Sequence, residues 1–297
     1  MICPLPLRRG DKIAIVATAR KISVEELSFA LNIFREWGLD PVLSPNLLSV
    51  YHQFAGTDEE RLSDLNWAIS HAEVKAIIVA RGGYGTVRIV DGIDFSVLRQ
   101  NPKWIIGYSD VTVLHNECNT NRICSLHATM PINFNRNAEA LESMRKFIFG
   151  ELPTYSFQAT HWNREGECRA ELVGGNLSLL YALSGTKSDL NTDGKILFLE
   201  DLDEYLYHID RMMLNLKRSG KLSNLKGIVV GGMTEMKDNV VPFGKTAEQI
   251  VLDAVKDYHY PVAFGFPAGH VDRNLALLLG SEVHLRVGRN CQLEFLP

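Results

Sequence analysis

The feature that most constrains the fold is the alternation of short apolar segments with helical patterns through the first 127 residues. Short apolar runs bounded by glycine or polar turns are typical of buried strands. They predict strands at residues 12–18, 40–43, 76–80, 104–107 and 123–127. Because helices are expected between successive strands, we predict a parallel sheet with helices on both faces, in a flavodoxin-like N-terminal domain of the α/β class.

The predicted helices have recognisable ends. Ser23 and Glu26 have the spacing of a capping box, and Gly38 is placed to end a helix over residues 24–37. Apolar residues recur at helical spacing over 57–71, which predicts a second helix. Further helices are expected to begin at residue 86 and to cover 111–119.

The second half of the chain follows a different pattern. Strand and helix patterns alternate between residues 171 and 264, and short β-like alternation follows over 275–295. We therefore expect three parts: an α/β domain over 1–135, a polar linker that includes one helix over 136–168, and a more β-rich α+β domain over 169–297.

Composition excludes several classes of protein. A net charge of −4 without a basic stripe argues against a nucleic-acid partner. No apolar run reaches the roughly 18 residues that a membrane helix needs. Arg8 and Arg9 follow the first short apolar piece instead of preceding it, so we expect no signal peptide and a cytoplasmic protein. The five cysteines include no C-x-x-C pair, which predicts reduced thiols.

A possible nucleophile follows the fourth predicted strand, in the sequence Gly107-Tyr108-Ser109-Asp110. A serine at a strand-to-helix turn presents its hydroxyl beside the free N–H groups of the helix, which suits acyl transfer. Val111 stands where an α/β-hydrolase would have a second glycine, so the motif does not indicate that fold. From these residues alone, a simple helix-capping role is the favoured alternative.

The third predicted strand ends in Arg81-Gly82-Gly83-Tyr84-Gly85. Three glycines permit positive φ angles and a close approach of the backbone to a ligand. The spacing matches neither a P-loop nor a dinucleotide-binding fingerprint. A tight turn and a functional loop are equally compatible with these residues.

A carboxylate and a histidine complete a possible catalytic set. Glu200 and Asp201 end an apolar strand, and His270 follows a loop that contains proline and glycine. A hydrolytic triad needs a base that takes the serine proton and a carboxylate that orients the base. Taken singly, neither Glu200 nor His270 would stand out from an ordinary loop residue.

Other polar residues have less specific interpretations. We expect His115 and Glu117 on a solvated helix face, His127 at the same sheet edge as the serine turn, and His161 in the linker. His208 is expected in a polar helix start. No H-E-x-x-H, C-x-x-C or clustered acidic pattern occurs, so the sequence predicts no metal and no cofactor.

Six segments, taken in chain order, together resemble motifs of the LD-carboxypeptidase family, the serine peptidases of murein recycling that include the microcin C immunity peptidases. They are RGGYG at 81–85, GYSD at 107–110, GGNLS at 174–178, LED at 199–201, DRM at 210–212 and PAGH at 267–270. The resemblance implies that Ser109 is the nucleophile, Glu200 the orienting carboxylate and His270 the general base. It also implies an oxyanion hole formed by the amides of Gly83 and Asp110.

The resemblance further implies the substrate and the assembly. Such enzymes cleave the bond between an L-configured diamino acid and the terminal D-alanine of a cytoplasmic murein tetrapeptide, through an acyl-enzyme, and they form homodimers. Arginine recognises a free carboxylate well. Arg81 and its neighbour Tyr84 are therefore substrate-binding candidates.

Two alternatives remain open. The protein could hydrolyse a peptidyl-nucleotide antibiotic, as immunity peptidases do, with Tyr205, Tyr207 or Trp162 stacked on the nucleobase. Local departures from the family pattern, such as Ala128 after His127 where a glycine is more usual, leave the substrate undecided. The protein could instead be a non-catalytic anion-binding or nucleotide-binding domain that uses residues 81–85 as an anion nest.

Overall fold

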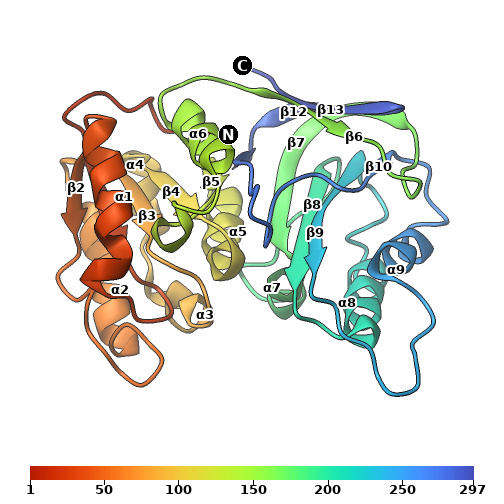
Figure 1. The fold of residues 1–297 in the computed structure, drawn as a ribbon, viewed down its shortest axis with the longest axis horizontal. Helices are drawn as coiled ribbons and strands as arrows, with labels where there is room; N and C mark the ends of the chain where they lie inside the picture. The colour runs from red at the N-terminus through yellow and green to blue at the C-terminus, as the bar shows by residue number, and fades with distance from the viewer. The chain divides into compact units, whose positions relative to one another are not determined.

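A computed structural model describes all residues, 1–297, and divides them into two compact units. Unit 1 comprises Met1–Glu151 and Leu275–Leu279. Unit 2 comprises Leu152–Asn274 and Gly280–Pro297. Figure 1 colours unit 1 mainly from red to yellow-green and unit 2 mainly from green to blue.

Unit 1 is built on a six-stranded sheet with the order β11-β5-β4-β3-β1-β2 (Figure 1). The parallel strands are β1 (Lys12–Val16), β2 (Asp40–Leu43), β3 (Val74–Val79), β4 (Trp104–Gly107) and β5 (Ser125–His127). The order β2-β1-β3-β4-β5 is the flavodoxin-like, doubly wound arrangement. The predicted fold class is therefore confirmed.

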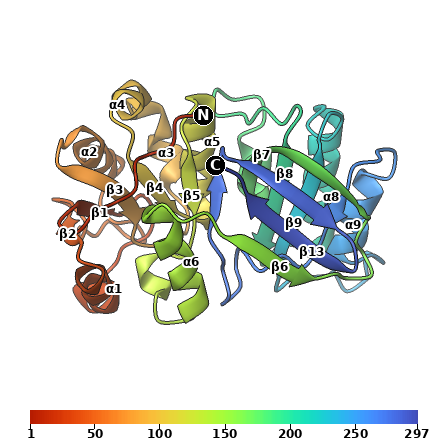
Figure 2. The same ribbon diagram turned by 90° about the horizontal axis from the view of Figure 1, so that it is seen from above.

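Helices cover both faces of this sheet, as Figure 2 shows. One face carries α1 (Val24–Glu36) and α6 (Ala138–Ile148), and the other carries α2 (Asp58–Ser70), α3 (Thr86–Ile89), α4 (Phe95–Gln100) and α5 (Thr112–Thr120). The capping box of Ser23 and Glu26 is formed at the start of α1. All four residues of β4 are buried. The core of unit 1 lies between the sheet and the helices that cover it. Burial of each large apolar side chain there stabilises the fold by roughly 1.5–3 kcal/mol.

Unit 2 contains a seven-stranded mixed sheet with the order β10-β9-β8-β7-β12-β13-β6. Its parallel strands are β7 (Gly166–Asn176), β8 (Ile196–Leu202), β9 (Gly227–Thr234) and β10 (Val262–Ala263), and its antiparallel strands are β12 (Glu282–Val287), β13 (Asn290–Phe295) and β6 (Thr154–Gln158). The helices are α7 (Leu177–Ala182), α8 (Leu206–Arg218) and α9 (Ala247–Ala254). Their apolar faces share one core with the parallel strands, and α8 and α9 lie side by side in both views (Figures 1 and 2). The predicted β-rich α+β class of this part is confirmed.

The segment over 136–168, predicted as a linker, is structured instead, and its parts belong to both units. Asn137 caps α6, which buries Met144 and Phe147 against unit 1. Farther along, β6 pairs with β13 at the edge of the second sheet. An edge strand keeps many residues in solvent, so its polar composition resembles that of a linker.

One strand lies in the other unit from the one expected. The β-like pattern over 275–295 was predicted to belong wholly to the second domain. In the structure, β11 (Leu277–Leu279) pairs antiparallel with β5, where Leu277 lies opposite His127. A run of leucines fits any buried strand, and its periodicity does not identify a partner 150 residues earlier in the chain.

The prediction of reduced thiols is wrong for two of the cysteines, because Cys3 and Cys124 form a disulfide. Ile2 and Ile123 are bridge partners, and the N–H of Cys124 donates to the carbonyl of Ile2. This pairing brings together two cysteines 121 residues apart, with their Cα atoms separated by 4.8 Å. The free thiols are Cys118, Cys168 and Cys291. None of the helices is long and apolar enough to cross a membrane.

Candidate active site

Ser109 lies at a sharp turn between β4 and α5. Its φ angle is +64°, a left-handed backbone that costs a non-glycine residue roughly 1–2 kcal/mol. Gly107 makes the turn possible, because a Cβ atom there would lie 2.8 Å from Cγ2 of Val111. Strain of this kind is typical of residues held in place for function. The turn leaves Ser109 partly exposed, with a short 3₁₀ segment (Ser109–Val111) directly after it.

The glycine loop packs against this serine. A Cβ atom on Gly82 would lie 3.2 Å from Cβ of Ser109 and 3.4 Å from its Oγ. A Cβ atom on Gly83 would instead meet the side chain of Arg20, at 2.6 Å. Gly83 is exposed. The Gly83 N–H, a proposed oxyanion donor, belongs to the peptide bond that follows Gly82. It is therefore part of the segment that packs against Ser109.

The side chain of Asp110 is hydrogen-bonded to Thr86, the residue that directly follows the glycine loop. Asp110 is buried, and its Oδ2 accepts hydrogen bonds from the backbone N of Thr86 at 2.9 Å and from the Thr86 hydroxyl at 2.6 Å. The Thr86 hydroxyl also lies 2.7 Å from that of Thr18. Burial raises the pKa of Asp110, although the hydrogen bonds from Thr86 oppose that rise. The residue after Ser109 is thus tied to the helix that follows the loop.

Arg61 is a second support that the sequence analysis did not identify. Its side chain is fully buried, and Nη1 donates to the carbonyls of Thr18 and Gly85, while Nη2 pairs with Asp58. A Cβ atom on Gly85 would lie 2.7 Å from Nη1, so only glycine leaves room for the guanidinium. The available indication was an arginine on the apolar side of α2, four residues before the buried Leu65.

Glu200 and His270 form a close pair in unit 2. His270 Nδ1 lies 2.6 Å from Oε2 of Glu200, and the His270 backbone N–H donates to the same oxygen at 3.2 Å. Glu200 is fully buried, whereas the His270 side chain is 14% exposed. Gly269 allows this approach, because a Cβ atom there would lie 2.6 Å from Oε2 of Glu200. One carboxylate oxygen therefore fixes both the position and the tautomer of the imidazole.

Charges around His270 favour its protonated form. Burial lowers the pKa of the imidazole, but the hydrogen bond to Glu200 and its negative charge, with smaller contributions from Asp201 and Glu235, outweigh burial and raise the pKa overall. A base that is stabilised once it has accepted a proton suits general base catalysis.

The substrate-binding candidates lie on the surface of unit 1. Nη1 of Arg81 lies 3.3 Å from the carbonyl of Lys21 and 3.5 Å from Oε1 of Glu26. A substrate carboxylate would therefore have to compete with Glu26 for this guanidinium. Tyr84 is 51% exposed, and its ring centroid lies 6.3 Å from that of Phe54.

The prediction of a solvated helix face for His115 and Glu117 is wrong, because both are buried. His115 Nε2 donates to the carbonyl of Gly107 at 2.9 Å, and Nδ1 lies 2.8 Å from the Ser125 hydroxyl. Burial lowers the pKa of His115 to about 4, so the neutral ring supports the backbone just before the serine turn. His127 ends β5, and its ring centroid lies 5.8 Å from that of Tyr108.

Two other histidines considered above, His161 and His208, contact neighbouring side chains. The rings of His161 and Trp162 lie 4.1 Å apart between centroids and are tilted by 42°. His208, in the first turns of α8, pairs with Glu204 at 2.5 Å. No group of three or more His, Cys, Asp and Glu side chains is arranged to hold a metal ion.

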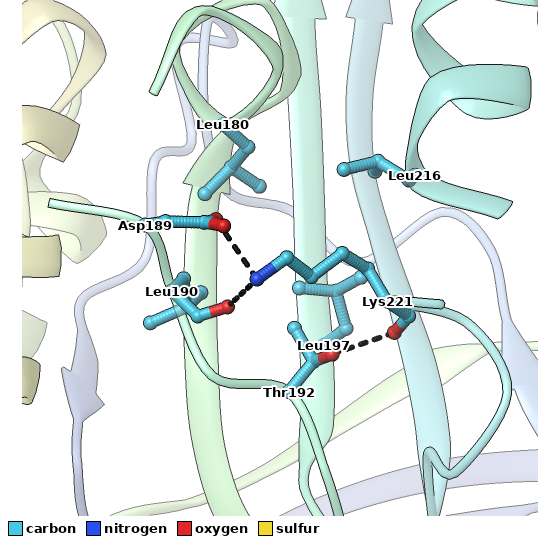
Figure 3. A pocket seen from close by; sticks show the side chains of 7 residues that line it. All are labelled: Leu180, Asp189, Leu190, Thr192, Leu197, Leu216 and Lys221. Atoms are coloured by element: carbon cyan, nitrogen blue, oxygen red, sulfur yellow. Dashed lines mark hydrogen bonds and ion pairs between the residues drawn. The ribbon is translucent and has the colours of Figure 1, made fainter. Parts of the chain in front are cut away.

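Figure 3 shows a small cavity between α7, α8 and the parallel strands of unit 2. Its volume is about 10 Å³, enough for about one water molecule. The ammonium of Lys221 extends across it, 2.8 Å from Asp189 and 2.6 Å from the carbonyl of Leu190 (Figure 3). A peptide does not fit this space, so it is part of the packing of unit 2.

Comparison with known proteins identifies the family. The LD-carboxypeptidase N-terminal domain matches residues 13–128, and the LD-carboxypeptidase C-terminal domain matches residues 169–285. The chain is 36% identical over 290 residues to the probable murein peptide carboxypeptidase of Bacillus subtilis (strain 168), a match that covers 94% of this chain and 90% of that protein.

Solved structures agree with this assignment. Muramoyltetrapeptide carboxypeptidase from Oxalobacter formigenes has a TM-score of 0.88 and 27% identity, covering 96% of this chain and 99% of that chain. The microcin C7 self immunity protein MccF, in a complex with aspartyl sulfamoyl adenosine, has a TM-score of 0.89, 18% identity, and coverage of 100% and 99%, which shows a common fold. The chain belongs to the LD-carboxypeptidase family of peptidases.

Proposed function

We propose that the protein is a serine carboxypeptidase that removes the terminal D-alanine from a murein tetrapeptide by cleaving the bond after the L-centre of its diamino acid. The observation that carries this proposal is the pair of Glu200 and His270, in which a fully buried carboxylate holds the imidazole by Nδ1. This leaves Nε2 as the nitrogen that accepts a proton. The strained turn at Ser109 supports the assignment of the nucleophile.

The proposed reaction has two steps. Ser109 Oγ attacks the scissile carbonyl while its proton passes to His270 Nε2, and the imidazolium then protonates the leaving amine of D-alanine. Water then attacks the resulting ester while its proton passes to His270 Nε2. The imidazolium returns that proton to Ser109 Oγ as the C–O bond of the ester breaks, which releases the shortened peptide with a new carboxyl group. The N–H groups of Gly83 and Asp110 are the proposed donors to the oxyanion in both steps.

We further propose that Arg81 and Tyr84 contact the substrate, that the enzyme works as a homodimer, and that it acts in the cytoplasm on recycled murein peptides. A D-alanine carboxylate is a suitable partner for a guanidinium. The Cys3–Cys124 disulfide is more typical of oxidising compartments, so cell fractionation is a necessary test of the location.

The function is tested by incubating the purified protein with an L-Ala-γ-D-Glu-diamino acid-D-Ala tetrapeptide and following D-alanine release by mass spectrometry. The wild type should release D-alanine, and Ser109→Ala should reduce the rate of release to a small fraction of the wild-type rate. Release by Ser109→Ala at the wild-type rate would contradict the mechanism. No release by the wild type would exclude the murein substrate.

A second candidate substrate is a peptidyl-nucleotide or aminoacyl-nucleotide antibiotic. The observation that favours it is an exposed pair of aromatic residues, Tyr205 and Tyr207, whose ring centroids are 5.6 Å apart and which are each 40% exposed. Aromatic rings of this kind can stack on a nucleobase. Trp162 packs against the core of unit 2 and is a less suitable partner. Hydrolysis of a peptidyl-adenylate analogue in preference to the tetrapeptide would support this candidate.

A non-catalytic anion-binding protein is the third possibility, with residues 81–85 as the anion site. It gives no reason for a buried carboxylate to hold the imidazole of His270. It predicts that a serine-directed phosphonate leaves the protein unmodified.

A further inference from the structure

A second buried acid lies directly beside the proposed catalytic carboxylate. Asp201 is 2% exposed and has no part in the reaction proposed above. Its Oδ1 accepts from the backbone N of Leu202 at 2.8 Å and from Nδ2 of Asn176 at 3.0 Å. Its Oδ2 accepts from the backbone N of Ser178 at 2.9 Å. Three N–H donors on two oxygens are an arrangement that favours the ionised carboxylate.

These contacts join the ends of two neighbouring strands. Asn176 is the last residue of β7, lies in register with Glu200 of β8, and caps α7. Its Oδ1 also accepts from the Ser178 hydroxyl at 2.7 Å. Asp201 therefore clamps the β7–α7 turn to the end of β8, one residue after Glu200.

Glu200 and Asp201 can both be buried because β8 is buried at every residue from Ile196 to Asp201. In a regular strand, neighbouring side chains point to opposite faces of the sheet. The pairing of β8 with β9 also shifts register between Leu199 and Asp201, next to these two acids. Glu200 thus reaches His270, while Asp201 reaches the start of α7.

The charge of Glu200 affects the pKa of Asp201, and both acids affect the pKa of His270. Burial and the charge of Glu200 raise the pKa of Asp201 to about 7, with a smaller contribution from Glu204. The acids that act on His270 are Glu200, Asp201 and Glu235. In its ionised form, Asp201 adds negative charge where an imidazolium forms.

We propose that Asp201 is a positioning residue of the active site, which fixes Glu200 by clamping the β7–α7 turn and whose negative charge favours the protonated form of His270. This inference rests on the proposed function, because it assigns His270 the role of base. It does not depend on which peptide the enzyme cleaves.

The test replaces Asp201 with asparagine and follows the His270 ring by NMR as a function of pH, with the resonance assigned by its loss in His270→Gln. The Asp201→Asn variant should shift the midpoint of the His270 titration to lower pH. The matched control is Asp257→Asn, which removes an exposed carboxylate paired with Lys217 and should leave the midpoint unchanged. An unchanged midpoint in a folded Asp201→Asn protein would overturn the inference.

Kinetics test whether Asp201 positions the proposed base. If the wild type hydrolyses the tetrapeptide, Asp201→Asn should lower kcat roughly 10- to 100-fold with little change in KM, because a displaced base impairs the reaction more than binding. If the wild type does not hydrolyse the tetrapeptide while the midpoint still shifts, the murein substrate fails and the effect of the Asp201 charge on His270 stands.

A second variant covers the case in which Asp201→Asn does not fold, as judged by circular dichroism. Asp201→Glu keeps the charge but lengthens the side chain, so it should keep the titration midpoint of His270 near that of the wild type and still lower kcat. Full kcat in Asp201→Glu would overturn the clamp.

Discussion

Replacement of Gly269 by alanine should destabilise unit 2 and disturb the contact between Glu200 and His270. Gly269 has a φ of +96°, and a Cβ atom there would lie 2.6 Å from both Cβ and Oε2 of Glu200. A left-handed backbone costs an alanine roughly 1–2 kcal/mol. Forced overpacking of a buried site costs a further 1–3 kcal/mol or so. The free energy of unfolding should therefore fall by about 2–5 kcal/mol.

The contact with Glu200 can be measured separately from the backbone strain. Gly220 has a similar φ of +81°, but a Cβ atom there meets nothing within 4 Å. Gly220→Ala should therefore lose only about 1–2 kcal/mol and keep full activity. Gly269→Ala should also lose roughly 100-fold in kcat, because a base displaced by about 1 Å works poorly. Urea denaturation gives the free energies. Equal stability and full activity in the two variants would refute the reasoning.

Three further predictions follow from the geometry. Ser109→Gly should exceed Ser109→Ala in unfolding free energy by about 1 kcal/mol, because glycine relieves the left-handed backbone, and equal values would contradict the strain. Arg61→Lys should lose about 1–3 kcal/mol in urea denaturation, because an ammonium cannot satisfy two buried carbonyls and a carboxylate in the same fork; wild-type stability would contradict this role. The pKa of His270 is raised in the folded state, so the stability that its pair with Glu200 contributes is present below pH 6.5 and is lost as the pH rises through the folded pKa. The melting temperature should therefore fall more steeply from pH 6 to about pH 9 in the wild type than in His270→Gln, and parallel curves would oppose the assignment.

The sequence was most informative where local chemistry decides structure. The strands of unit 1 are recognisable because each is a short apolar run before a glycine or polar turn. The capping box of Ser23 and Glu26 fixes the start of α1 through side-chain hydrogen bonds within four residues. The serine turn was also predictable, because Gly107 ends a buried strand and Ser109 lies two residues later.

Features that depend on distant partners were not predictable in the same way. The short strand β11 joins the first sheet through pairing with β5, and nothing in three leucines specifies that partner. Cys3 and Cys124 meet because a bridge between Ile2 and Ile123 aligns their segments. Both arrangements are tertiary and leave no periodic pattern in the chain.

The candidate site shows the same contrast between features that local sequence predicts and features that depend on distant partners. Glu200 and His270 were identified as a pair by resemblance, and their 2.6 Å contact depends on Gly269, which local sequence marks only as a loop glycine. Arg61 looks like an ordinary helix residue until the carbonyls of Thr18 and Gly85 converge on it. Supports of this kind form where residues distant in the sequence meet in the fold, so local sequence does not reveal them.

The central claim is that Ser109 is a nucleophile activated by His270. The most direct measurement is covalent labelling with a serine-directed phosphonate, followed by intact-protein and peptide mass spectrometry. We expect one adduct on Ser109 in the wild type, no adduct in Ser109→Ala, and greatly slowed labelling in His270→Gln, which lacks the proposed base. An unmodified wild-type protein, or a label on another residue, would contradict the claim.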